Sequence, residues 1–173
     1  MLYRIFLALF FVSFFAIDAA PLSTNNTEKW SKSKFTYDIL RYPKSVSRKE
    51  TLDAFGYAFI QISALLPIKF EQVFMFSSEP ADIRIVYAKN ISNIQSNSAA
   101  GIIAFDDNKM FKYYEIGEET MFVTYKDITW AAMYALRKLL QENKVKDAEF
   151  IQFDQPLYSF THYVQPKFIL KKP

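Results

Sequence analysis

The sequence contains no cysteine, and this absence constrains the fold more than any other feature. Without cysteine, the chain has no disulfide bond, no thiolate nucleophile and no cysteine-bound metal cluster to organise it. Its stability must come from burying apolar side chains, and 51% of its 173 residues are apolar. That length is enough for one domain with a core that needs no covalent staple.

The first 19 residues have the layout of a secretory signal peptide. Arg4 precedes an apolar run from Ile5 to Ile17, and small residues follow the run. The run is shorter than the roughly 20 apolar residues that a bilayer-spanning helix needs. We therefore predict cleavage near Ala20, an extracellular location, and no membrane contact after cleavage.

Two regions are predicted after the signal peptide. Residues 20–33 are polar and lack periodicity, which is typical of a flexible segment. Residues 34–173 are predicted to form the folded domain. Sequons at Asn25 and Asn90 would accept N-linked glycans in an exported protein. The net charge of +3 comes from dispersed Lys and Arg residues, so we expect no nucleic-acid partner.

Strand and helix patterns alternate along this domain. Residues 35–40 alternate large and polar side chains and predict a half-buried strand. Ser47 and Glu50 predict a capping box before a helical apolar repeat that Pro67 ends. Further strands are predicted at 68–76, 83–88, 101–105 and 110–114, with a turn at 106–109.

A second helix is predicted after Asp127, which can cap it, and Asn143 is a reasonable end. The apolar side chains predicted to share one helix face are Ile128, Ala132, Ala135 and Leu139. The order strand, helix, strands, helix predicts an α+β domain in which a mixed twisted sheet packs against two long helices.

Several of these segments resemble the catalytic domain of the matrixins, the matrix metalloproteinases of peptidase family M10. The resembling segments are Trp30 with 34–39, 58–59 with 66–70, 81–85, 104–107 and 156–158. Their order along the chain makes the set more specific than any one match. The resemblance implies a metzincin-type fold and zinc-dependent cleavage of extracellular-matrix proteins.

The residues that such cleavage requires are missing. The family motif H-E-x-x-H-x-x-G-x-x-H supplies three zinc-binding histidines and a glutamate that activates water. On the predicted second helix, the first two histidine positions fall at Tyr134 and Lys138 with the glutamate at Ala135, or at Ala131 and Ala135 in an alternative register. The chain has one histidine, His162, so no register supplies three.

The family's other zinc-site positions have also changed. The resemblance places the last ligand of a structural zinc at Ala104, and it places the methionine beneath the catalytic zinc at Asp154. Alanine cannot replace a metal ligand, and Asp154 replaces the apolar floor beneath the catalytic zinc with a carboxylate. We therefore predict no zinc cofactor and no catalytic residue.

Calcium is left open, because Asp82, Asp106 and Asp107 fall at or near family calcium-ligand positions. Against calcium, Ile102 and Lys109 stand where the family has acidic partners. A solvated Asp-Asp-Asn turn is therefore the favoured interpretation of 106–108.

Three functional hypotheses follow from these observations. The favoured one is a secreted, catalytically inactive matrixin-like protein that binds an extracellular protein or peptide, with Tyr134 and Lys138 facing the former cleft. An alternative is the active zinc metalloendopeptidase that family membership alone implies, which the histidine count opposes. A third is an unrelated secreted binding protein, favoured if the two helices did not pack on one sheet.

Overall fold

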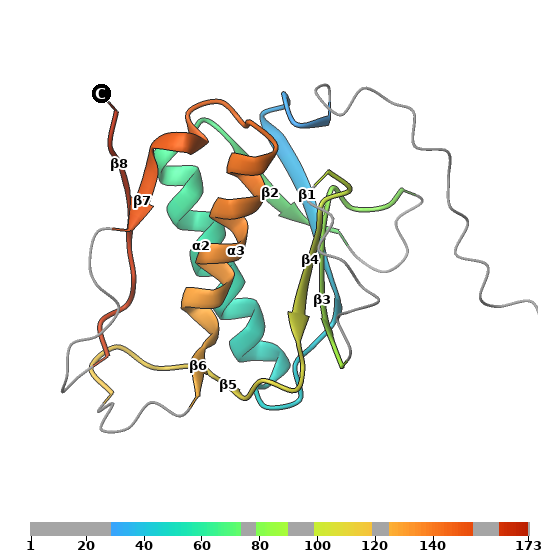
Figure 1. Cartoon of the computed structure of the whole chain (residues 1–173), viewed down its shortest axis with the longest axis vertical. Helices are drawn as coiled ribbons and strands as arrows, with labels where there is room; N and C mark the ends of the chain where they lie inside the picture. Colours follow the sequence, from blue (N-terminus) through green and yellow to red (C-terminus); the bar gives the residue numbers. More distant parts are fainter. Residues whose placement is uncertain (1–28, 74–78, 90–98, 119–124, 154–162, 173) are drawn as a thin grey trace, which may run out of the picture.

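The computed structural model describes residues 29–73, 79–89, 99–118, 125–153 and 163–172 (Figure 1). In chain order the elements are β1 (Lys34–Arg41), α2 (Arg48–Leu65), β2 (Lys69–Gln72), β3 (Ile83–Ala88), β4 (Ile102–Asp106), β5 (Phe111–Lys112), β6 (Lys126–Asp127), α3 (Ile128–Glu142), η2 (Ala148–Phe150), β7 (Ile151–Phe153) and β8 (Phe168–Leu170). The predicted signal peptide, both sequons, His162, Asp154 and the segment 156–158 lie outside the described residues.

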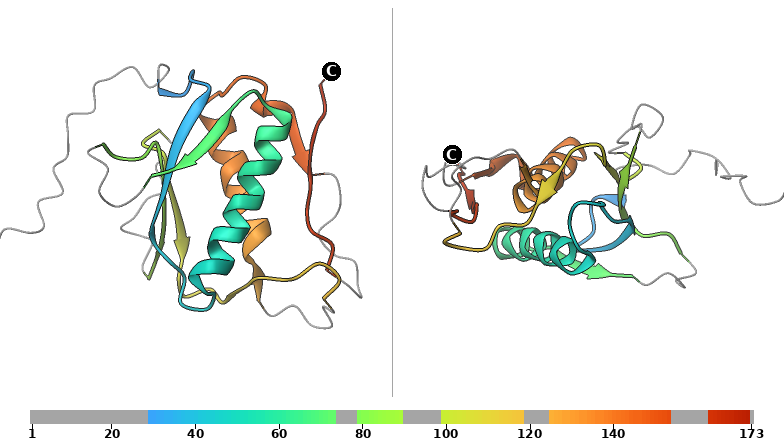
Figure 2. Two further views of the ribbon diagram at one scale, coloured as in Figure 1. Left: turned by 180° about the vertical axis from the view of Figure 1, so that it is seen from behind. Right: turned by 90° about the horizontal axis from the view of Figure 1, so that it is seen from below.

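Four strands form the main sheet in the order β2-β1-β3-β4, and each neighbouring pair is parallel. Figures 1 and 2 show α2 and α3 side by side on one face of this sheet. The predicted α+β class, with a sheet packed against two long helices, is confirmed. Within the described residues the main sheet is parallel rather than mixed, and antiparallel pairing occurs between β7 and β8.

Helix α2 begins and ends where the sequence predicts. The Ser47 hydroxyl accepts from the Glu50 amide at 3.2 Å, and the Glu50 carboxylate accepts from the Ser47 amide at 2.9 Å, which is a complete capping box. The helix stops before Leu66 and Pro67. Its buried side chains are Thr51, Ala54, Phe55, Ala58, Phe59 and Ile62.

Helix α3 also has its predicted ends. The Asp127 carboxylate accepts from the Thr129 amide at 2.8 Å, and Asn143 is the C-cap. The buried face differs in detail from the predicted one, because Met133 and Leu136 fill the core while Ala135 is only partly buried. The larger side chains therefore determine which way the helix is rotated.

Aromatic side chains occupy the space between the helices and the sheet. Phe55 is fully buried and contacts Phe105 of β4 at a ring-centroid distance of 6.0 Å. Tyr87 of β3 stacks on Phe105 at 4.8 Å. Trp30 is 3% exposed and packs on Phe35, so packed structure begins upstream of residue 34, inside the segment predicted to be flexible.

Two short sheets lie beyond the main one. β5 pairs in parallel with β6 below the helices, so the strand predicted at 110–114 is reduced to two residues. β7 and β8 lie on the side of the helices away from the main sheet (Figures 1 and 2). The Tyr57 hydroxyl of α2 donates to the Pro166 carbonyl at 3.1 Å and ties this segment to the helix. Among the described helices, none is long and apolar enough to cross a bilayer.

Candidate binding surface on helix α3

The positions predicted to replace the zinc ligands lie on the outer face of α3. Tyr134 is 42% exposed, Lys138 is exposed and Ala135 is partly buried. The Lys138 ammonium lies 3.6 Å from the Glu142 carboxylate, one helical turn further on. This face of α3 therefore presents a phenol ring and an ion pair to the surface.

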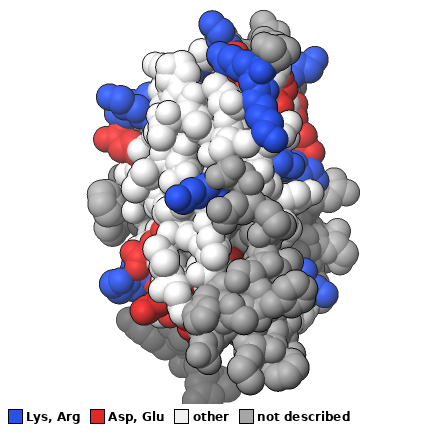
Figure 3. Space-filling view, turned by 90° about the vertical axis from the view of Figure 1, so that its left-hand side faces the viewer, with Lys and Arg blue, Asp and Glu red and all other residues white. Residues whose placement is uncertain are grey.

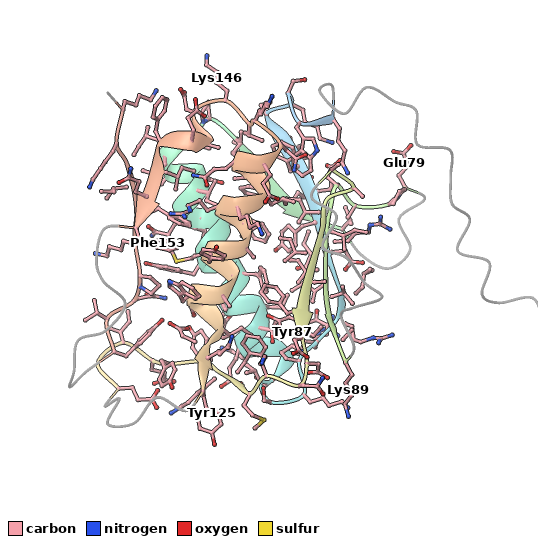
Figure 4. All side chains as sticks on the ribbon, viewed as in Figure 1. Glu79, Tyr87, Lys89, Tyr125, Lys146 and Phe153 are labelled. Carbon is pink, nitrogen blue, oxygen red and sulfur yellow. The ribbon has the colours of Figure 1, made fainter. Side chains whose placement is uncertain are left out.

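Tyr134 belongs to a group of side chains that joins α3 to β7, which we call the aromatic cluster: Trp130, Tyr134, Arg137 and Phe153. The Trp130 ring stacks on Tyr134 at 5.2 Å and on Phe153 at 6.2 Å. The Arg137 guanidinium lies 5.8 Å from the Tyr134 ring and 5.0 Å from the Phe153 ring. Figure 4 shows Phe153 beside α3 on the side of β7. The cation is thus held between two aromatic faces.

Two buried N–H donors of the aromatic cluster have no acceptor among the described residues. They are the indole Nε1 of Trp130 and the Nε of Arg137. Arg137 also forms no ion pair with a carboxylate of the described residues. A buried donor without a partner is destabilising, and a ligand that supplies acceptor oxygens would satisfy it.

The donor set on this face does not fit the zinc ion that the family resemblance implies. Catalytic zinc sites use histidine nitrogens with at most one or two carboxylate or thiolate ligands. The outer face of α3 offers tyrosine, alanine and lysine at these positions. In the described part of the chain, no group of three or more His, Cys, Asp or Glu side chains could hold a metal ion.

Asp82 anchors the start of β3 through bonds within the protein. One carboxylate oxygen accepts from the amide of Thr36 at 2.8 Å and from its hydroxyl at 2.9 Å, and the other accepts from the Lys32 ammonium at 2.5 Å. Burial raises the pKa of Asp82, but these donors outweigh it and hold the pKa below its usual value. Both carboxylate oxygens of Asp82 are therefore bonded to donors within the protein.

Asp106 and Asp107 lie at the opposite end of the sheet from Asp82, because Asp106 pairs with Ala88 at the end of β3. The Asp106 carboxylate accepts from the Asn108 amide at 3.0 Å, which forms the predicted Asp-Asp-Asn turn. The Asp107 carboxylate accepts from the Lys44 amide at 3.0 Å. The structure thus separates Asp82 from the other two calcium candidates.

Sequence reasoning missed a contact that joins the last described segment to the start of α3. The Tyr163 hydroxyl donates to the Asp127 carboxylate at 2.8 Å, and the Tyr163 ring stacks on Tyr114 at 5.2 Å. Burial raises the pKa of Asp127, although the bonds from Tyr163 and the helix amides oppose this. Burial and the nearby Asp127 charge raise the pKa of Tyr163.

We expect Asp127→Asn to change how stability depends on pH. The folded pKa of Asp127 is raised, so the folded state binds more protons than the unfolded state above the unfolded pKa of about 3.9. The stability that Asp127 contributes is therefore present below about pH 3.9 and is lost as pH rises through the folded pKa. Urea unfolding of both proteins across this range should show the wild type losing stability relative to the variant.

Tyr163→Phe provides the matched control, because it removes a hydrogen bond that favours the ionised Asp127. Without this hydrogen bond the folded pKa of Asp127 should rise further. The variant should therefore continue to lose stability at pH values above the range in which the wild type loses it. If the curves of wild type and Asp127→Asn run parallel, the proposed pKa shift is wrong.

A comparison with protein families gives one finding. Residues 29–113 match the family described as Matrixin. The match includes β1, α2 and β2 to β5 up to Tyr113, and it ends before α3. Every resembling segment except 156–158 lies inside it. No curated protein matches the chain.

Proposed function

Residues 29–113 of the chain match the matrixin family, and from that premise we propose that the protein is a secreted, catalytically inactive member that binds an extracellular protein or peptide. The observation that carries the proposal is the residue set on α3. Tyr134, Ala135 and Lys138 stand where the resemblance places two zinc ligands and the general base. With one histidine in the whole chain, three imidazole ligands cannot be assembled.

Peptide hydrolysis by this family depends on a metal-activated water and a carboxylate base. Ala135 cannot accept a proton, and the Lys138 ammonium would repel a cation at a ligand position. Tyr134 is held in a ring stack with Trp130. These side chains support a role in contact with a partner rather than in bond cleavage.

The aromatic cluster supplies the features that protein-binding sites use. Trp, Tyr and Arg are the residue types enriched among side chains that dominate binding energy. Trp130 and Arg137 also hold buried donors without acceptors, which a peptide's carbonyl or carboxylate groups would satisfy. Figure 3 shows uncharged surface on the side of β7 and β8, with Lys, Arg, Asp and Glu side chains on and around it. An uncharged area with a charged surround suits contact with a protein.

Secretion is supported by the sequence alone. The signal-peptide layout of residues 1–19 and the sequons at Asn25 and Asn90 are typical of an exported glycoprotein. The competing function is a zinc metalloendopeptidase of the extracellular matrix, which family membership favours and the α3 residues oppose.

Metal content distinguishes these two functions. We expect elemental analysis of the purified, chelator-free protein to find no stoichiometric zinc, and we expect no chelator-sensitive cleavage of a generic matrixin peptide. The double variant Tyr134→His with Lys138→His places two imidazoles four residues apart on one helix face. It should therefore gain zinc binding that the wild type lacks, measured by calorimetric titration with zinc.

The matched control is Tyr134→Phe with Lys138→Gln, which alters the same positions without adding a ligand and should bind no zinc. Stoichiometric zinc together with chelator-sensitive cleavage in the wild type would overturn the proposal in favour of the metalloendopeptidase. A double-histidine variant that folds but gains no zinc would show that this face of α3 is not the family's metal position.

A further inference from the structure

A hollow of about 660 Å³ lies at the end of the molecule where α3 stops. It is bordered by the turn before β1, the exit of α2 and the turn that follows α3. Figure 4 shows Lys146 at this end of the molecule. None of the residues of the aromatic cluster lines the hollow, so it is a separate site.

The walls of the hollow combine an apolar floor with a basic rim. Apolar surface is supplied by Trp30, Pro67, Ile68 and Val145, and the basic side chains are Lys32, Lys144 and Lys146. Among the described residues, Lys144 and Lys146 form no ion pair. The lining carboxylate, Glu142, has Lys138 as its partner. Lys32 is paired with Asp82, so the uncompensated positive charge beside the apolar surface belongs to Lys144 and Lys146.

Trp30, which lines the hollow, carries an unpaired hydrogen-bond donor. The residue is 3% exposed, and its indole Nε1 is buried with no acceptor among the described residues. Burying an N–H group without a partner costs free energy, and native structures rarely leave one unpaired. A ligand acceptor that reached this Nε1 would meet the need.

The backbone at Lys144 is a third, independent observation. Lys144 has φ +54°, and the Val145 amide donates to the Leu140 carbonyl at 3.0 Å in the turn that ends α3. Glycine is the favoured residue at such a left-handed position, because a side chain there is strained. A strained non-glycine residue on the rim of a hollow is typical of a binding site that uses the side chain.

We propose that this hollow binds an apolar carboxylate, the chemistry offered by a single apolar residue that ends in a free carboxyl group. The apolar side chain lies on the floor formed by Trp30 and Val145. The carboxylate accepts from the ammonium groups of Lys144 and Lys146 and from the indole N–H of Trp30. The volume of the hollow falls within the roughly 300–1,000 Å³ that small-ligand sites occupy.

The test uses N-acetylphenylalanine as the probe and its carboxamide as the matched control, followed by NMR of the two tryptophan indole N–H signals. The chain has two tryptophans, and Trp130→Phe assigns the Trp30 signal. The acid should shift the Trp30 signal downfield in a saturable manner, leave the Trp130 signal in place, and bind at least about fivefold more tightly than the amide.

Lys144→Gly separates a binding role from a structural one. Removing the strained side chain should raise Tm by a few degrees and weaken binding of the acid by about fivefold. Lys146→Gln should weaken binding similarly, while Lys109→Gln, in the turn after β4, should leave binding unchanged. Equal binding of acid and amide, an unmoved Trp30 signal, or full affinity in Lys144→Gly would each overturn the proposal. The outcome does not depend on the proposed function of α3.

Discussion

The variant Gly101→Ala is expected to lose about 3 kcal/mol or more of its free energy of unfolding, a large share of the roughly 5–15 kcal/mol that stabilises a typical domain. Gly101 precedes β4 with φ +75°, and a Cβ atom there would lie 1.9 Å from the Asp82 backbone oxygen. That oxygen cannot retreat easily, because Thr36 and Lys32 hold the Asp82 side chain. The Gly101 carbonyl also accepts from the Arg84 amide, so moving the loop breaks a bond to β3.

The protein's other two glycines provide graded controls. Gly117 has φ +84° and nothing within 4 Å of the added Cβ, so Gly117→Ala should cost only the left-handed strain of about 1–2 kcal/mol. Gly56 lies inside α2 with free space around it, so Gly56→Ala should stabilise by about 0.5–1 kcal/mol. Urea unfolding of the three variants measures the change in the free energy of unfolding that each substitution causes. If Gly101→Ala lowers the free energy of unfolding no more than Gly117→Ala does, the predicted clash with the Asp82 backbone oxygen is wrong.

Phe55→Ala should lower the free energy of unfolding by about 3–5 kcal/mol, the range for truncating a buried aromatic side chain. Phe55 is fully buried, and its ring lies 6.0 Å from Phe105 of β4 and 6.3 Å from Phe59 of α2. It therefore contacts both the helix layer and the sheet, and its removal leaves a cavity that the rigid surroundings fill only partly. Chemical denaturation should show a lower midpoint with little change in the denaturant slope.

Ile60→Ala is the matched control for Phe55→Ala. Ile60 lies on the same helix but is 68% exposed, so its truncation should change the free energy of unfolding by less than about 0.5 kcal/mol. A similar loss of unfolding free energy in both variants would mean that the substitutions act on the helix α2 itself rather than on core packing. A loss below about 1 kcal/mol in Phe55→Ala would contradict its central position in the core.

Much of the fold could be predicted because local chemistry and tertiary packing agree. Ser47 with Glu50, and Asp127 alone, mark helix starts through side-chain bonds to amides a few residues away, and such signals are readable from sequence. The short pairings β5–β6 and β7–β8 have no comparable local signal. These pairings depend on the surface that the two packed helices offer to the strands. An alternation of apolar and polar residues over only two or three positions is too short to identify such strands.

The functional role of the α3 positions stays a prediction. The missing histidines are visible in the sequence, but the exposed position of Tyr134 was not predicted. The roles of Trp130 and Arg137 were not foreseen, although their separation of seven residues places them on one helix face and could have suggested a shared contact. The left-handed conformation of Lys144 was not predicted either, because glycine is the usual residue at a left-handed helix end and this chain has lysine there.

The strand order of the main sheet has a consequence for how the chain reaches its native state. β1 comes first along the described chain but lies inside the sheet, with Lys34 beside Lys69 and Tyr37 beside Ile83. Closing such long loops is slow because their entropy is lost before the distant contacts form. Before β2 and β3 pair with β1, both edges of β1 are exposed. The side chains of Phe35 and Ile39, which are buried in the native state, are exposed at that stage as well. Refolding from denaturant should therefore compete with intermolecular association, and yield should fall as protein concentration rises.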